Sequence, residues 1–179
     1  MSLTFITGNA DKFKEASSII PHLEQVDLDL PEIQEMNPEV IIKAKLQEAL
    51  KHYPQDVIVE DTSLYLDAFN GFPGPLMKWM MRAIGVQGIY DAVAATGKFG
   101  ATAKTVIGYA RTADDIQYFE GIIKGTIVAP RGDKGFGWDP IFLPENQTLT
   151  FAEMPQELKD TFSMRRLAFN ALEAALTNE

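Results

Sequence analysis

The chain has no cysteine and only two histidines among its 179 residues. Without cysteine, disulfides, thiolate metal sites and a cysteine nucleophile are all excluded. The two histidines, His22 and His52, are too few and too far apart in the sequence to suggest a zinc cluster.

Positive charge is also scarce, because 16 lysines and arginines stand against 25 acidic residues and the formal net charge is −9. This balance argues against a nucleic-acid groove or an anionic membrane surface. We therefore expect neither nucleic acid nor membrane as a partner. A small anionic substrate is still compatible with the chain if local lysines and a divalent cation offset the overall field.

Long apolar runs are missing as well. No stretch approaches transmembrane length, and Met1–Phe5 lacks the basic start and apolar run of a signal peptide. We expect a cytoplasmic enzyme or binding protein. No linker, repeat or low-complexity segment interrupts the chain, so residues 1–179 are predicted to form a single domain, divided into two lobes by a cleft.

The first segment has a pattern that suits an anion. Leu3–Thr7 is predicted to be a short buried strand, stopped by Gly8-Asn9, and a helix is predicted from Lys12 to Ile20. A helix N-terminus after a tight glycine turn can bind phosphate through backbone N–H groups, and Lys12 would add a cation. The alternative is a plain strand–helix turn with a solvent-exposed lysine.

Acidic residues follow two predicted strands. Glu32 comes just after one of them, and Glu60 and Asp61 lie between Asp56–Val59 and a further strand at Leu64–Ala68. Adjacent acids at the end of an apolar strand are costly unless they are solvated, paired or hold a cation. Hard oxygen ligands of this kind suit Mg²⁺. A magnesium site is the functional interpretation, and an acidic turn is the alternative.

The remaining elements follow from apolar periodicity and from turn residues. They are a strand at Val26–Leu30, a helix from Asn37-Pro38 to Leu50, a helix after Pro75, a short helix at Ile89–Ala95, a hairpin of Thr102–Ala110 with Ile116–Val128, a helix after Pro155 and a last helix capped by Ser163. Lys45 is most simply an exposed helix lysine. Arg165 and Arg166 oppose the dipole of the last helix, which an anion or a base carbonyl would explain.

A glycine-rich loop, Gly135–Pro140, carries the features of a site for a flat ligand. Glycines flank Phe136, and Asp139 follows as a directional acceptor. Glycine permits close approach of the backbone, and an exposed ring offers a flat apolar face. A nucleobase would suit such a loop, whereas the alternative is an ordinary glycine turn with a core aromatic.

Seven motifs occur in order along the chain. They are Thr7-Gly8-Asn9…Lys12…Glu15, Val59-Glu60-Asp61-Thr62-Ser63-Leu64, Gly71-Phe72-Pro73-Gly74, Phe119…Gly121…Gly125, Pro130-Arg131-Gly132…Gly135-Phe136-Gly137-Trp138-Asp139-Pro140…Phe142, Thr150-Phe151-Ala152-Glu153-Met154 and Lys159…Ser163…Arg165. Together they resemble the inosine triphosphate pyrophosphatase family, from residue 4 to residue 168. Each motif is weak alone, but seven in the right order are highly specific.

The resemblance implies an α/β fold, with a mixed, elongated central β-sheet and two α/β lobes around a deep active-site cleft. It also implies a homodimer that hydrolyses ITP, dITP and XTP to the monophosphate and pyrophosphate. Mg²⁺ would be the cofactor, with Mn²⁺ as a substitute.

The family's site residues carry over position by position. The catalytic residues would be Asp61, Glu60 and Lys12, and the metal ligands would be Glu32 and Asp61. The phosphates would contact Thr7, Gly8, Asn9, Lys12 and Lys45. The base would contact Phe136, Gly137, Trp138, Asp139, Lys159, Ser163, Met164 and Arg165. Of the acids, Asp61 is the first candidate to position the attacking water or to accept its proton.

Two departures from the family pattern stand out. Met164 replaces a usual histidine, and Leu76 stands where tyrosine is common. Methionine cannot donate a hydrogen bond, so discrimination against adenine would be weaker or would depend on Arg165 alone. Two other functions stay open: a Maf-like pyrophosphatase of other nucleotides, and a purine-nucleotide-binding regulator without catalysis.

Overall fold

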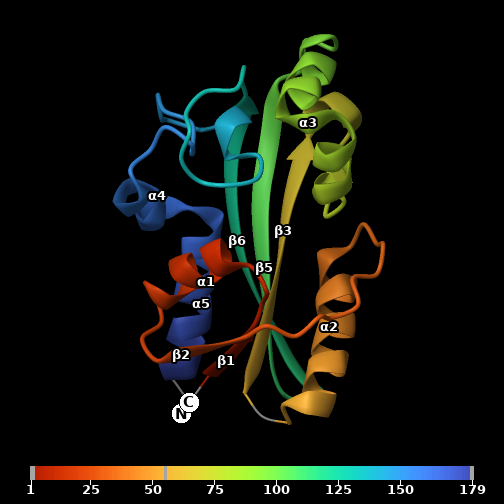
Figure 1. Cartoon of the computed structure of the whole chain (residues 1–179), viewed down its shortest axis with the longest axis vertical. Coiled ribbons are helices and arrows are strands. Elements are labelled where there is room, and N and C mark those ends of the chain that lie inside the picture. Colours follow the sequence, from red (N-terminus) through yellow and green to blue (C-terminus); the bar gives the residue numbers. More distant parts are fainter. Residues whose placement is uncertain (1–2, 55, 178–179) are drawn as a thin grey trace. The chain divides into compact units, whose positions relative to one another are not determined.

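The computed structural model describes residues 3–54 and 56–177, so the ends of the predicted domain and residue 55 lie outside the described residues. Within those two ranges the strands form one seven-stranded sheet, in the order β2-β1-β3-β5-β6-β7 with β4 paired to β3 (Figure 1). β1 is parallel to both β2 and β3, whereas β4 and β7 are antiparallel to β3 and β6. The predicted α/β fold with a mixed sheet is confirmed.

The strands are β1 (Leu3–Ile6), β2 (Leu23–Val26), β3 (Val57–Leu66), β4 (Pro73–Gly74), β5 (Gly100–Thr112), β6 (Asp115–Ile127) and β7 (Phe142–Pro144). The helices are α1 (Ala10–Ser17), α2 (Pro38–His52), α3 (Met77–Ala94), α4 (Gln156–Phe162) and α5 (Met164–Thr177), with short 3₁₀ helices η1 (Asp67–Phe69) and η2 (Asp139–Ile141).

The described chain divides into two compact units. Unit 1 contains the residues up to Thr62, residues 105–121 and the residues from Met164 onward. Unit 2 contains residues 63–104 and 122–163. Each unit is therefore assembled from segments that are far apart in the sequence.

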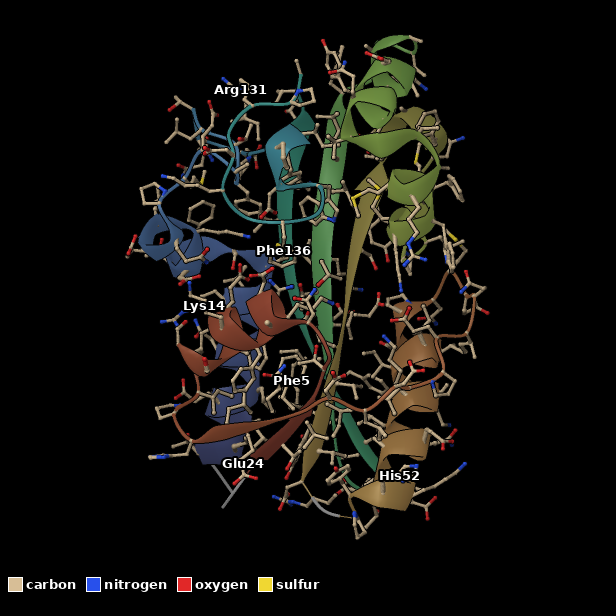
Figure 2. The ribbon with its side chains drawn as sticks, viewed as in Figure 1. Phe5, Lys14, Glu24, His52, Arg131 and Phe136 are labelled. Atoms are coloured by element: carbon tan, nitrogen blue, oxygen red, sulfur yellow. The ribbon has the colours of Figure 1, made fainter. Side chains whose placement is uncertain are left out.

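In unit 1, one face of the strands packs against α1 and α5. Phe5 of β1 and Ile58 of β3 share a buried cluster with Ala16 of α1 and Phe169 of α5. The rings of Phe5 (labelled in Figure 2) and Phe169 meet edge to face, with 5.9 Å between their centroids. Burial of these side chains is the main force that holds both helices on this face.

The opposite face of the same strands packs against α2. Ile6, Val57 and Val59 form a second buried cluster with Ile42 and Leu46 of α2. Successive strand residues point to opposite faces, which is why Phe5 and Ile6 belong to different clusters. The chain leaves β1 into α1 on one face and enters β3 from α2 on the other. Ligands of open α/β sheets bind where connections change face in this way, at the carboxyl ends of the strands.

Three predicted boundaries were wrong. The two strands predicted on either side of Glu60-Asp61 are one continuous strand, β3, so these acids lie inside a strand and not in a turn. The strand predicted at Val26–Leu30 lies earlier, because parallel pairing with β1 aligns Leu3 with Leu23. The short helix at Ile89–Ala95 is the second part of α3, which is kinked at Gly85. The predicted hairpin is confirmed as β5 and β6.

Unit 2 has a compact aromatic core. The indole of Trp138 packs edge to face on Phe142 at 5.3 Å between centroids, and Phe142 lies 5.4 Å from Phe151. These rings anchor the glycine-rich loop to β7.

Across the described residues, the helices are all too short or too polar to span a membrane.

Candidate active site

The turn between β1 and α1 is built by short polar side chains. Asn9 caps α1, and its Oδ1 accepts hydrogen bonds from the N–H groups of Asp11 and Lys12 at 3.0 Å each. Thr7 Oγ1 accepts from the N–H of Asn9 at 3.1 Å. Gly8 leaves room for the side chain of Asp27, because a Cβ atom at this position would lie 2.6 Å from Asp27 Oδ1.

This cap changes the expected mode of anion binding. The N–H groups of Asp11 and Lys12 are already bound to Asn9, so they are not available to a phosphate as the sequence pattern suggested. The donors that this turn can direct to an anion are the side-chain NH₂ group of Asn9, the hydroxyl of Thr7 and the ammonium of Lys12. Lys12 is about three-quarters buried, with a side-chain exposure of 23%.

Lys12 belongs to a cluster of four charged residues from α1, β3 and α5, which we call the ion network: Lys12, Glu15, Glu60 and Arg165. Lys12 Nζ lies 3.2 Å from Glu60 Oε1. Arg165 donates from Nε to Glu60 Oε2 at 2.8 Å and from Nη2 to Glu60 Oε1 at 2.9 Å. Arg165 Nη1 donates to Glu15 Oε2. Thr62 supports the network, because its hydroxyl donates to Glu60 Oε1 at 2.7 Å.

The network keeps Glu60 and Arg165 charged. Burial raises the pKa of Glu60, but the charges of Arg165 and Lys12 outweigh burial and hold that pKa well below its ordinary value. Burial lowers the pKa of Arg165, but Glu60 and Glu15 raise it above its ordinary value. A carboxylate that binds protons this weakly is a poor general base. The geometry therefore does not support Glu60 as the group that accepts a proton from water.

Asp61 points the other way, toward α2. Lys45 Nζ lies 3.9 Å from Asp61 Oδ1 and 3.4 Å from Glu32 Oε1. Lys45 is buried, so its interpretation as a solvent-exposed lysine was wrong. Glu60 is not part of this group, since neighbouring strand residues face opposite sides of a sheet.

Glu32 and Asp61 have the chemistry of a site for a hard divalent cation. Both carboxylates approach the same ammonium group, which shows that the space next to them attracts positive charge. Among the described residues, no group of three or more histidines or acids lies close enough together to hold a metal ion. Mg²⁺ is usually held by one or two carboxylates together with water and substrate phosphates, so two carboxylates fit this ion.

In unit 2, the glycine-rich loop closes around a buried ion pair. Lys159 Nζ lies 2.8 Å from Asp139 Oδ2, which also accepts the N–H of Phe136 at 3.0 Å. The same ammonium lies 5.0 Å from the ring centroid of Phe136 and 5.1 Å from that of Phe151. Gly135, at φ +71°, must be glycine, because a Cβ atom would lie 2.1 Å from Asp139 Oδ2.

The predicted base residues fall into two groups. Phe136, Gly137, Trp138, Asp139, Lys159 and Ser163 belong to unit 2, whereas Met164 and Arg165 belong to unit 1. Figure 2 labels Phe136 on its loop. The indole of Trp138 is buried among other aromatic rings, so a contact with a ligand would come from its backbone. Arg165 forms ion pairs with Glu60 and Glu15. These carboxylates are the anions that compensate its unfavourable position at the N-terminus of α5.

Sequence reasoning missed the roles of Glu15, Thr62 and Thr105. Glu15 follows Lys12 by three residues, the spacing that places two side chains on one face of a helix. That spacing was a usable signal, although no partner for Glu15 was visible in the sequence. Thr62 and Thr105 share a hydrogen bond of 3.1 Å between hydroxyls on neighbouring strands, and such a pair has no signature in the sequence.

The fold and the unit 1 residues define an α/β protein with cationic and acidic groups gathered on β3 and on α1, α2 and α5, the helices that pack beside it. Residues 3–175 match the model of the Ham1 family, and the chain belongs to this family. It is 43% identical over 169 residues to a protein of Batrachochytrium dendrobatidis named inosine triphosphate pyrophosphatase, covering 92% of this chain and 88% of the relative.

Solved structures of similar proteins also point to the Ham1 family. The Ham1 protein of Staphylococcus aureus is similar with a TM-score of 0.79 and 26% identity, over 99% of both chains. A structure from Mycobacterium abscessus, described as a nucleoside-triphosphatase and dITP/XTP pyrophosphatase, has a TM-score of 0.73 and 30% identity, over 98% of this chain and 99% of that one.

Proposed function

We propose that this chain is a nucleoside triphosphate pyrophosphatase that hydrolyses ITP, dITP and XTP to the monophosphate and pyrophosphate. The observation that carries the proposal is membership of the Ham1 family over nearly the whole chain. The names of the relatives from B. dendrobatidis and M. abscessus support the reaction and its substrates. Membership of this family leaves the Maf-like alternative without support.

In the proposed reaction, water attacks the α-phosphorus. The bond between the α-phosphorus and the oxygen that bridges the α- and β-phosphorus atoms then breaks. Pyrophosphate leaves with the bridging oxygen, and the proton of the water passes to an acceptor. We assign that acceptor to Asp61, because its carboxylate is partly exposed, whereas Glu60 is locked to Arg165. Thr7, Asn9, Lys12 and Lys45 would bind the phosphate oxygens and stabilise the charge that develops on them.

Glu32 and Asp61 would hold Mg²⁺, or Mn²⁺ in its place. When bound, the metal ion would withdraw charge from the phosphate oxygens. Because the protein offers two carboxylates here, the substrate phosphates would complete the coordination shell. Ham1 proteins are nucleotide hydrolases of a kind that typically needs a divalent metal, and the identity of the ion is part of this proposal.

The purine is assigned to the Phe136 loop of unit 2. An aromatic ring at the loop surface can stack on a base. The 6-oxo group of hypoxanthine or xanthine accepts hydrogen bonds, whereas the amino group of adenine donates them. A buried donor such as the ammonium of Lys159 would favour the oxo bases, because the amino group of adenine cannot accept a hydrogen bond from it. We further propose a cytoplasmic homodimer, for which light scattering at micromolar concentration is the test of assembly.

The test is pyrophosphate release from ITP, dITP, XTP, ATP, GTP and dTTP with Mg²⁺. Release is expected from the first three. Asp61→Asn should lower kcat by about 10²- to 10⁴-fold, the usual contribution of a general base. Asp115→Asn, at an exposed acid of β6, is the matched control and should keep wild-type rates.

Two results would contradict the assignment. Absence of release from every purine triphosphate, together with binding of ITP in a titration, would instead support the regulator without catalysis. An undiminished rate in Asp61→Asn would remove the proposed role of this acid.

A further inference from the structure

The ion network has a feature that binding of phosphate by Lys12 alone does not require. Its carboxylates and cations balance, two of each, and three of the four side chains are almost fully buried. Lys12 is the most exposed member, at the carboxyl end of β1 beside Thr7 and Asn9. A buried set of charges that ends in one partly exposed ammonium can fix the position of that ammonium.

Glu60 is the residue that holds Lys12. Its Oε1 atom receives Lys12 Nζ, Arg165 Nη2 and the hydroxyl of Thr62, so this oxygen is held from three directions. Thr62 is in turn bound to the hydroxyl of Thr105 on the neighbouring strand. Such a connected set of hydrogen bonds in a poorly solvated site is stiff.

Glu15 sets how strongly Glu60 attracts Lys12. If Arg165 had Glu60 as its one partner, the arginine would neutralise most of the charge of that carboxylate. Because Arg165 also donates to Glu15, its positive charge is shared between two carboxylates. Glu60 therefore keeps negative charge for the ammonium of Lys12. Glu15 also lies one turn after Lys12 on α1, so the same helix carries both ends of the network.

We propose that Glu15 and Thr62 are positioning residues that act through Glu60 to place the ammonium of Lys12 for the reaction. Neither of the two needs to touch the substrate. The inference rests on the proposed function for its kinetic consequence, whereas the placement of Lys12 can be measured without any nucleotide.

The kinetic test is a double-mutant cycle. Glu15→Gln and Thr62→Val should each lower kcat by about 10-fold, up to the ~10²-fold that a misplaced catalytic group costs. Lys12→Met should lower kcat by about 10²- to 10³-fold, as for loss of one donor to developing charge. In the Lys12→Met background, Glu15→Gln and Thr62→Val should change kcat by less than about twofold, because residues that act as a unit are not additive.

The structural test uses ¹³C reductive methylation, which leaves lysine charged and with one N–H to donate. The resonance of Lys12, identified by its loss in Lys12→Arg, should differ from that of exposed Lys14 on the same helix. It should move toward the Lys14 resonance in Glu15→Gln and in Thr62→Val. Glu24→Gln and Thr112→Val, at exposed positions of unit 1, are the matched controls and should leave it in place.

The proposal would be overturned if the Lys12 resonance did not move in either Glu15→Gln or Thr62→Val while both variants stay folded. It would also be overturned if these two substitutions lowered kcat equally in the wild type and in the Lys12→Met background. A moved resonance with unchanged kcat would also overturn it. If circular dichroism shows that Glu15→Gln does not fold, the test rests on Thr62→Val, because this substitution exchanges side chains of nearly equal shape. If the wild type releases no pyrophosphate, the proposed function fails and the resonance alone decides the placement of Lys12.

Discussion

At the scale of single residues, Glu60 and Asp61 show how strand geometry separates two neighbours. Glu60 faces α1 and α5 and is bound to Arg165 through both of its oxygens. Asp61 faces α2 and is partly exposed, 3.9 Å from Lys45. One acid is therefore bound within the ion network, whereas the other is partly exposed. Two adjacent carboxylates in the sequence do not imply a shared site.

The two acids should respond differently to loss of charge. Glu60→Gln should lower the free energy of unfolding by about 3–5 kcal/mol, because it leaves Arg165 buried without its main partner. Asp61→Asn should lower it by no more than ~1 kcal/mol, because its ion pair is long and partly solvated. Urea denaturation at pH 7 measures both. A larger loss in Asp61→Asn than in Glu60→Gln would contradict the division of roles.

At the scale of elements, the position of α5 depends on a glycine of β6. A Cβ atom at Gly121 would lie 1.8 Å from the carbonyl oxygen of Met164 and 2.7 Å from the nitrogen of Ala168. These are backbone atoms, so they cannot move without the helix. Gly121 thus permits the close approach that carries Arg165, the next residue after Met164, into the ion network.

Gly121→Ala should force α5 away from β6. We expect a loss of about 3 kcal/mol or more in the free energy of unfolding, at the upper end of the cost of overpacking. Thr126→Ala, at an exposed position of the same strand, is the control and should cost less than ~1 kcal/mol. Urea denaturation of both variants is the measurement, and an equal cost would show that β6 and α5 do not meet as closely as the structure has them.

At the scale of the whole molecule, neither compact unit is a continuous piece of chain, and β3, β5 and β6 contribute residues to both. Interactions that hold these strands together therefore act on the stability of the entire chain. Tyr109 of β5 is one of them: its hydroxyl donates to Asp56 Oδ1 at 2.6 Å, next to the start of β3, and accepts from Arg111 Nε at 2.9 Å.

Tyr109 should make global stability depend on alkaline pH. Burial, and then the hydrogen bond to Asp56, raises the pKa of Tyr109 from 10.0 to about 12. A group whose pKa is higher in the folded state stabilises fully below its unfolded pKa, and that contribution is lost as pH rises from about 10 to 12. Thermal unfolding from pH 8 to 11 should show a smaller alkaline loss in Tyr109→Phe than in wild type. Tyr90→Phe is the control, and parallel pH profiles of Tyr109→Phe and wild type would refute the role of Tyr109.

The order of short motifs was enough to predict the family, the α/β class and the class of reaction. These properties depend on residue identity at fixed local spacing, as in the hairpin of β5 and β6. The candidate site residues could also be chosen from the sequence, because lysines, acids and a glycine-flanked phenylalanine have side chains that suit phosphates, metal ions and a nucleobase.

The partners of those side chains were decided by the tertiary structure. Arg165 meets Glu60 across 105 positions of sequence and Glu15 across 150, and no local pattern encodes such pairs. The separation of Glu60 from Asp61 required knowing that β3 runs on without a turn, because only a continuous strand sends neighbours to opposite faces. The sequence alone thus determined which groups the protein has for its chemistry, and the packing of α1, α2 and α5 on the sheet decided which of them are buried in the ion network and which stay partly exposed.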